Sequence, residues 1–208
     1  MSAPLLQVDQ LACVRGDLPL FADVSFGLSA GEWMHLQGDN GAGKTSLMRI
    51  LCGLSPAAAG EVRWAGVPIR ESAETYRAEM LYLGHTLSLK DDLSALENLQ
   101  FEAAVSGEPL HPQRAQAALD SLGLRGREHL PVRVLSQGQK RRVALARLLT
   151  ARARLWILDE PFVALDPAAV TLLVDLLGRH VTSGGMVLYT SHQTVPMSGS
   201  GHQYRLAS

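Results

Sequence analysis

The residues best suited to chemistry form a glycine-rich segment. Residues 38–45 read Gly-Asp-Asn-Gly-Ala-Gly-Lys-Thr and match the phosphate-binding pattern G-x-x-x-x-G-K-[ST]. Glycines let the backbone N–H groups turn toward phosphate oxygens, Lys44 can reach the β- and γ-phosphates, and the hydroxyl of Thr45 suits Mg²⁺. The segment predicts a nucleotide site made by Gly38, Asp39, Asn40, Gly41, Ala42, Gly43, Lys44, Thr45 and Ser46.

Two acidic residues follow an apolar run farther along the chain. The run Leu155–Leu158 ends in Asp159 and Glu160. We expect Asp159 to orient Mg²⁺ and Glu160 to activate the water that attacks the γ-phosphorus. The alternative is that the two acids only begin a solvated turn. The phosphate-binding loop upstream favours the catalytic interpretation.

Hydrophobic periodicity predicts the elements that must position these residues. Apolar patterns predict strands at 6–13, 21–28, 33–37, 60–66, 81–83, 155–158 and 186–189. Apolar residues at helical spacing predict a helix directly after the glycine loop, beginning near Leu47. They predict further helices at 95–105, 115–122 and 138–150, and Asp166-Pro167 begins one more. The first two strands suit antiparallel pairing. The pattern indicates an α/β fold with a mostly parallel sheet, interrupted by helices. We expect one domain, 1–208, with a core at 1–84 and 152–208 and a helical lobe at 85–151.

Composition narrows the class of protein. Hydrophobic residues make up 47% of the 208 residues, which favours a globular chain with a sizeable core. A formal charge of −1 does not favour nucleic acid as a partner. The longest stretch without charged side chains, 180–204, contains many polar residues, so we expect no transmembrane span, and no signal peptide is visible.

A third motif, Leu-Ser-Gln-Gly-Gln at 135–139, lies between the loop and the acidic pair. Alone, Ser136 would be an ordinary helix N-cap. In this order, with Ala164-Leu165-Asp166 and His192 after the acids, the motifs resemble those of the nucleotide-binding domains of ABC transporters over essentially the whole chain. The resemblance implies a P-loop NTPase fold of the ABC type, with an antiparallel β part and a helical lobe, that hydrolyses ATP with Mg²⁺.

The resemblance also implies roles for residues outside the loop. A second copy would form a head-to-tail dimer in which Ser136, Gly138 and Gln139 meet ATP held by the other protomer's loop. His192 would act in catalysis beside Glu160. Asp166 would communicate between the two sites, serve as the N-cap before Pro167, or do both.

Two positions depart from the family pattern. His85 stands where most of the family has a glutamine that contacts Mg²⁺ and links the core to the helical lobe, so we expect His85 to take part in the site. Arg15 stands where an aromatic side chain usually stacks on adenine. A guanidinium plane can also stack, which leaves base selectivity open.

A narrower resemblance is to the ABC ATPases of cytochrome c maturation. It rests on Leu83-Gly84-His85, Leu89-Lys90, residues 93–99, Cys13 near Arg15 and the short chain. It implies work in haem export or in energy-dependent release of a holo-haem chaperone, through separate membrane-spanning subunits, at the cytoplasmic face of the inner membrane as a peripheral subunit. The alternatives are the ATPase of another ABC importer or exporter, a nucleic-acid-associated ABC ATPase, and a P-loop kinase, which has no use for residues 135–139.

Overall fold

The computed structural model describes residues 5–207, which form two compact units. The first unit comprises the chain up to Gly84, Ala153–Glu160 and the chain from Val174, and the second comprises His85–Arg152 and Pro161–Leu173. The expected lobe, 85–151, lies in the second unit, which also contains residues 152 and 161–173. Residues 1–4 and 208 of the expected core lie outside the described residues.

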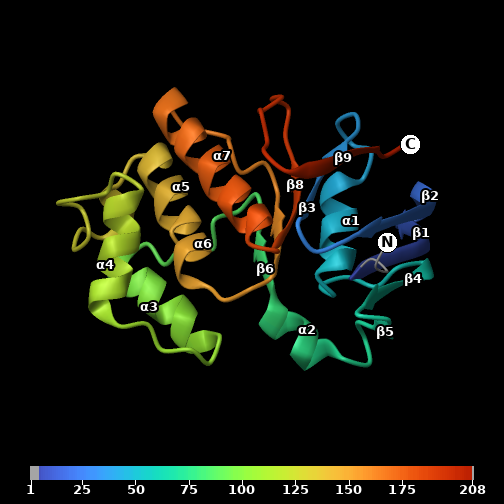
Figure 1. The fold of residues 1–208 in the computed structure, drawn as a ribbon, viewed down its shortest axis with the longest axis horizontal. Helices are drawn as coiled ribbons and strands as arrows, with labels where there is room; N and C mark the ends of the chain where they lie inside the picture. The colour runs from blue at the N-terminus through green and yellow to red at the C-terminus, as the bar shows by residue number, and fades with distance from the viewer. Residues whose placement is uncertain (1–4, 208) are drawn as a thin grey trace. The chain divides into compact units, whose positions relative to one another are not determined.

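Two sheets build the first unit, and all of their strands except β7 are labelled in Figure 1. The antiparallel sheet has the order β2-β1-β4-β5, formed by β1 (Leu6–Arg15), β2 (Leu18–Leu28), β4 (Ala59–Trp64) and β5 (Val67–Pro68). The second sheet has the order β6-β7-β8-β3-β9, formed by β3 (Glu32–Gln37), β6 (Met80–Leu83), β7 (Leu155–Leu158), β8 (Met186–Thr190) and β9 (Ser200–Arg205). All its pairings are parallel. The predicted α/β class with an antiparallel part is confirmed.

The core of the first unit packs both sheets and helix α1 (Lys44–Leu51) together. Alternate residues of β1, such as Leu6 and Val8, are buried, as expected for a strand with one face toward a core. All four residues of β7 are buried, which accounts for its continuous apolar sequence. Because β3 and α1 both belong to this core, the glycine loop between them has two fixed ends.

The sequence patterns missed the strands β5 and β9 and the short helix α2 among the described residues of the first unit. β9 pairs in parallel with β3 although five of its six residues are exposed. Helix α2 (Ala73–Glu79) buries only Tyr76. None of these elements carries the apolar periodicity that identifies half-buried strands and amphipathic helices.

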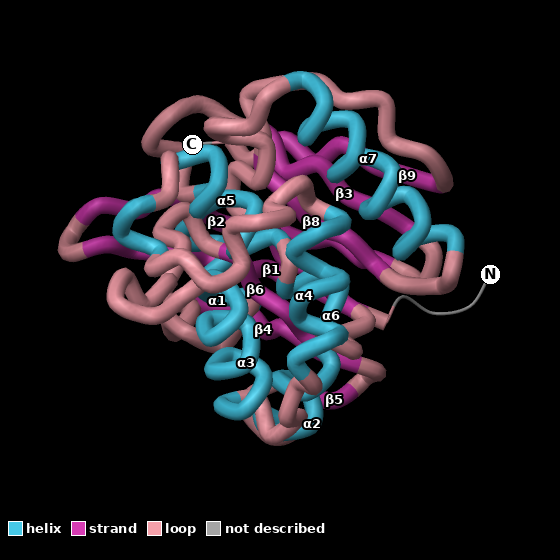
Figure 2. The backbone as a smooth tube through the Cα atoms, turned by 90° about the vertical axis from the view of Figure 1, so that its left-hand side faces the viewer, coloured by secondary structure: helices cyan, strands magenta, loops and turns pink. Residues whose placement is uncertain are grey.

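Helices make up the second unit, and the tube in Figure 2 draws them in cyan. They are α3 (Ala95–Val105), α4 (Pro112–Ser121), the 3-10 turn η1 (Val132–Val134), α5 (Gln137–Leu145) and α6 (Arg147–Thr150). The prediction of one helix over 138–150 is wrong because Ala146 interrupts it with a turn, its N–H reaching the carbonyl oxygens of Arg142 and Val143 at 3.0 and 3.2 Å. The apolar spacing continues through this turn, so periodicity alone does not reveal it.

Helix α7 (Pro167–Thr182) begins in the second unit and ends in the first. Asp166 caps it, since its Oδ1 accepts a 2.8 Å hydrogen bond from the N–H of Ala169. Within residues 5–207, none of the helices combines the length and the apolar character that crossing a membrane would require.

Candidate active site

The glycine loop adopts a backbone that other residues rarely reach. Gly41 and Gly43 have φ angles of 88° and 95°, in the left-handed region. A β-carbon on Gly43 would also lie 3.0 Å from Cδ1 of Phe21 on β2. The loop therefore needs glycine at position 43 both for its conformation and for its close packing against β2.

Lys44 places its ammonium group over this loop. Its Nζ donates hydrogen bonds to the carbonyl oxygens of Gly38 at 2.7 Å and Asp39 at 3.0 Å. Lys44 is also the first residue of α1, whose N-terminus carries the positive end of the helix dipole. The loop thus combines a cation with a helix N-terminus, an arrangement suited to binding phosphate.

Asp159 connects the loop to the end of β7. Thr45 Oγ1 donates a 2.9 Å hydrogen bond to Asp159 Oδ2, joining residues 114 positions apart in the sequence. The Asp159 side chain is buried, with 3% of its surface exposed, and its Oδ1 accepts a 2.8 Å hydrogen bond from Thr190 Oγ1. The structure thus brings together the two residues predicted to hold Mg²⁺.

The two predicted catalytic residues also lie together. His192 Nε2 is 3.5 Å from Oε1 of Glu160. The Glu160 side chain is 13% exposed and that of His192 is 64% exposed. Glu160 has a φ of 51°, and its N–H donates a 2.9 Å hydrogen bond to Thr190 Oγ1. An acid sheltered from most solvent, beside a histidine open to it, is an arrangement suited to activating water.

Thr190 is a functional candidate that belongs to none of the sequence motifs. It ends β8 and is fully buried. The one available signal was a hydroxyl residue directly after an apolar strand and two positions before His192. That signal is too common to stand out without the contacts.

The second unit holds the third sequence motif, residues 135–139, at the start of α5. Ser136 caps this helix, and its Oγ accepts a 3.2 Å hydrogen bond from the N–H of Gln139. Gln139 Oε1 in turn accepts a 2.9 Å hydrogen bond from the N–H of Ser136. This capping box aligns the helix N-terminus and occupies both side chains.

Asp166 contacts the same helix. Besides capping α7, its Oδ2 accepts a hydrogen bond from Arg142 of α5. The hydrogen bond from the Ala169 N–H and the charge of Arg142 lower the pKa of the Asp166 carboxyl. The carboxylate therefore ties the start of α7 to α5.

The two positions that depart from the family pattern are both exposed. His85 comes two residues after the end of β6 and is the first residue of the second unit. Arg15 ends β1 and pairs with Leu18 at the turn of the β1–β2 hairpin. Both side chains are accessible to a ligand or a partner.

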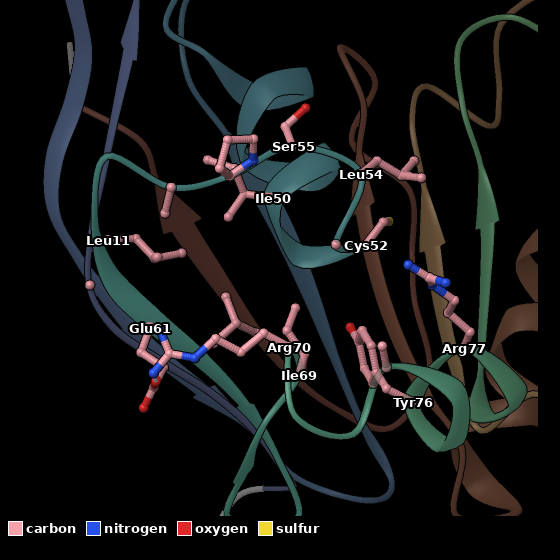
Figure 3. A pocket seen from close by; sticks show the side chains of 16 residues that line it. Leu11, Ile50, Cys52, Leu54, Ser55, Glu61, Ile69, Arg70, Tyr76 and Arg77 are labelled. Atoms are coloured by element: carbon pink, nitrogen blue, oxygen red, sulfur yellow. Dashed lines mark ion pairs between the residues drawn. The ribbon is translucent and has the colours of Figure 1, made fainter.

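A pocket of about 540 Å³ lies at the other end of α1 from the glycine loop (Figure 3). Ile50, Cys52, Leu54 and Tyr76 are among its lining residues. Burial raises the pKa of the Cys52 thiol, which therefore stays protonated at neutral pH. None of the predicted nucleotide-site residues lines this pocket, so the two features are distinct.

The glycine loop, the lysine at a helix N-terminus and the buried aspartate at the end of a neighbouring parallel strand define a P-loop ATPase domain. The sequence pattern of the family described as "ABC transporter" matches residues 21–163, more than half of the chain. The chain therefore belongs to the ABC transporter family of ATP-binding proteins, and it is an ATPase.

Known proteins resemble the chain over nearly all its length. It is 50% identical over 200 residues to the "Cytochrome c biogenesis ATP-binding export protein CcmA" of Nitrosospira multiformis, covering 96% of this chain and 97% of that protein. A solved ATP-binding subunit of an ABC transporter superimposes with a TM-score of 0.80 at 29% identity, covering 90% and 80% of the two chains. A dimeric post-hydrolysis structure of the ATP-binding cassette MJ0796, bound to ADP and Pi, shares the fold at a TM-score of 0.80 and 22% identity, covering 90% and 88%.

Proposed function

We propose that the chain is the ATP-hydrolysing subunit of a transporter complex that acts in c-type cytochrome biogenesis. The main observation in support of ATP hydrolysis is the hydrogen bond from Thr45 to Asp159. This bond joins the phosphate-binding loop to the acid that follows β7. The pathway is supported by 50% identity, over nearly the full length, to a protein named for cytochrome c biogenesis.

Thr45 and Asp159 are the residues that would hold Mg²⁺. A hydroxyl and a carboxylate oxygen 2.9 Å apart are hard oxygen donors, the type that this ion prefers together with substrate phosphates. Bound there, Mg²⁺ would neutralise charge that develops on the phosphate oxygens.

Glu160 and His192 would act on the attacking water. Glu160 would orient the water and accept its proton while the water oxygen bonds to the γ-phosphorus and the bond to the bridging β–γ oxygen breaks. His192 would contact the γ-phosphate next to Glu160, because its Nε2 lies 3.5 Å from Glu160 Oε1 and its side chain is open to solvent. Lys44 would pair with the β- and γ-phosphates after exchanging its contacts with the loop carbonyls.

A second copy would complete the site in a head-to-tail dimer. Ser136 and Gly138 stand at the N-terminus of α5, whose dipole favours an anion. Ser136 Oγ would turn from the Gln139 N–H to the γ-phosphate held by the partner copy. Asp166, through Arg142, would couple this helix end to the start of α7.

The dimer would act at the cytoplasmic face of the inner membrane as a peripheral subunit. Its partners would be separate membrane-spanning subunits, which ATP binding and hydrolysis would move between two states. The work would serve haem export or the energy-dependent release of a holo-haem chaperone. His85 would pass the state of the nucleotide to those subunits.

The Lys44→Ala substitution tests this function in cells that depend on the chain. The variant lacks the cation for the β- and γ-phosphates, so these cells should make haem and b-type cytochromes but lose covalent haem in c-type cytochromes. Haem-stained gels of membrane and periplasmic fractions measure the loss. The exposed Arg114→Ala change, on α4, is the control and should leave the staining normal. Normal covalent haem with Lys44→Ala would refute the pathway, and an uptake or export defect in its place would indicate another ABC transporter.

A further inference from the structure

Thr190 lies between the two strands that lead into the predicted site. It pairs with Leu36 of β3, the strand that enters the glycine loop. On its other side, the register of Leu158 with Tyr189 sets the next residue, Asp159, beside Thr190. The Thr190 side chain has no exposed surface. The Thr190 hydroxyl group is therefore buried between β3, which leads into the glycine loop, and the end of β7, which Asp159 and Glu160 follow.

This hydroxyl donates to one acid and accepts from the next. Thr190 Oγ1 donates to Asp159 Oδ1 at 2.8 Å and accepts from the N–H of Glu160 at 2.9 Å. Thr45 binds the other carboxylate oxygen of Asp159 at 2.9 Å. Both oxygens of Asp159 are thus restrained, which limits rotation of the carboxylate.

The hydrogen bond between the Glu160 N–H and Thr190 also affects the backbone conformation of Glu160. Glu160 has a φ of 51°, a left-handed conformation that costs free energy for a residue with a side chain. Its N–H points to Thr190, which helps to stabilise that conformation. The direction in which the Glu160 side chain leaves the backbone depends on this left-handed conformation.

We propose that Thr190 is a positioning residue for ATP hydrolysis. Its hydroxyl holds the Asp159 carboxylate in the orientation that suits the metal. It also fixes the Glu160 backbone, so that the side chain can act on the attacking water. Thr190 itself would contact neither the metal nor the water. This inference rests on the proposed function. Hydrogen-bonding partners of metal ligands typically contribute 10- to 100-fold to metal affinity or activity, about the effect expected here.

Thr190→Val is the direct test, because valine has nearly the same shape and suits a buried strand but lacks the hydroxyl. The full chain, purified with its membrane subunits, is assayed for ATPase rate against Mg²⁺ concentration. We expect kcat to fall about 10- to 100-fold and the half-saturating Mg²⁺ concentration to rise about 10-fold. Binding of a fluorescent ATP analogue in EDTA should stay unchanged, which a general loss of structure would not allow.

Two further variants locate the effect at the hydroxyl. Thr190→Ser keeps the group and should restore both parameters to within about threefold of the unsubstituted chain. Ser191→Ala removes the neighbouring hydroxyl, which accepts a hydrogen bond from the N–H of Gln193, and should leave the Mg²⁺ midpoint unchanged.

A Thr190→Val protein with the unsubstituted Mg²⁺ midpoint and kcat would overturn the role of Thr190 and leave the proposed ATPase standing. A Thr190→Ser protein as impaired as Thr190→Val would also overturn it, because the hydroxyl would then not matter. Absence of Mg²⁺-dependent hydrolysis in the unsubstituted complex would overturn the proposed function and this inference together.

Discussion

The carbonyl oxygen of Ala164 lies 2.9 Å from the position that a β-carbon on Gly138 would take. Gly138 belongs to the first turn of α5, and Ala164 belongs to the loop before α7. A backbone oxygen cannot yield as a flexible side chain can, so the loop and the helix end approach this closely only because residue 138 has no side chain.

Gly138→Ala should therefore displace the start of α5 or the loop at Ala164. Alanine favours a helix by about 1 kcal/mol over glycine, which offsets part of the steric cost, so the melting temperature should change little. ATPase activity should fall by about 10-fold or more, since the helix end would be misplaced for the partner copy's nucleotide. Gly178→Ala on α7 is the matched control, because its β-carbon would meet Ser198 Cβ at an ordinary 3.4 Å. Equal activity of both variants would contradict this role of Gly138.

Glu160→Gln should separate nucleotide binding from hydrolysis. The amide keeps the size of the side chain but cannot accept the proton of water, so hydrolysis should fall by about 100- to 10,000-fold while ATP affinity is retained. The variant should also accumulate as an ATP-bound dimer, which size-exclusion chromatography with ATP measures. The exposed Glu74→Gln change, on α2, should behave as the unsubstituted chain. Hydrolysis at the ordinary rate in Glu160→Gln would remove Glu160 as the base.

His85→Ala should weaken coupling more than binding. His85 is exposed just after β6, so its removal should leave the loop and its ATP affinity intact. If His85 links the nucleotide to the membrane subunit, stimulation of the ATPase by that subunit should fall several-fold. ATPase titrations with the reconstituted membrane subunit compare the two proteins, and superimposable curves would leave His85 as a solvated loop residue.

His180 should make the stability of the first unit depend on pH. Its ring stacks on Trp156 with centroids 3.6 Å apart, and its Nε2 lies 3.1 Å from the carbonyl oxygen of Arg154. Burial lowers the pKa of His180 below its ordinary value of 6.5. The unfolded chain therefore binds the proton more readily, so stability is full above pH 6.5 and is lost as the pH falls through the folded-state pKa.

Urea unfolding at pH 7.5 and 5.5 measures that loss. His180→Phe can still stack on Trp156 but does not titrate, so its stability should differ less between the two pH values than that of the unsubstituted chain. The exposed His111→Gln change is the control and should keep the original difference. An equal difference in His180→Phe would exclude His180 as a source of the pH dependence.

Some elements followed directly from local sequence. The apolar spacing of residues 95–105 predicted this helix with its observed bounds, and the structure adds a capping box of Ser94 and Glu97 at its start. The strand at 155–158 was also predicted as observed, because a short, continuous apolar run is typical of a buried parallel strand. β9 could not be predicted in this way, because its mostly exposed residues carry no apolar pattern. Its strand conformation is instead stabilised by pairing with β3.

Local sequence is enough to predict the phosphate-binding chemistry of this protein, because the glycines and Lys44 lie in one short segment between one strand and one helix. It also predicts roles for Asp159 and Glu160, because the two acids directly follow an apolar strand. That Thr190 joins these two acids is visible in the folded chain alone. The register of three parallel strands, formed by segments far apart in the chain, brings its hydroxyl to 2.8 Å from Asp159, and no local pattern records a distance set by such pairing.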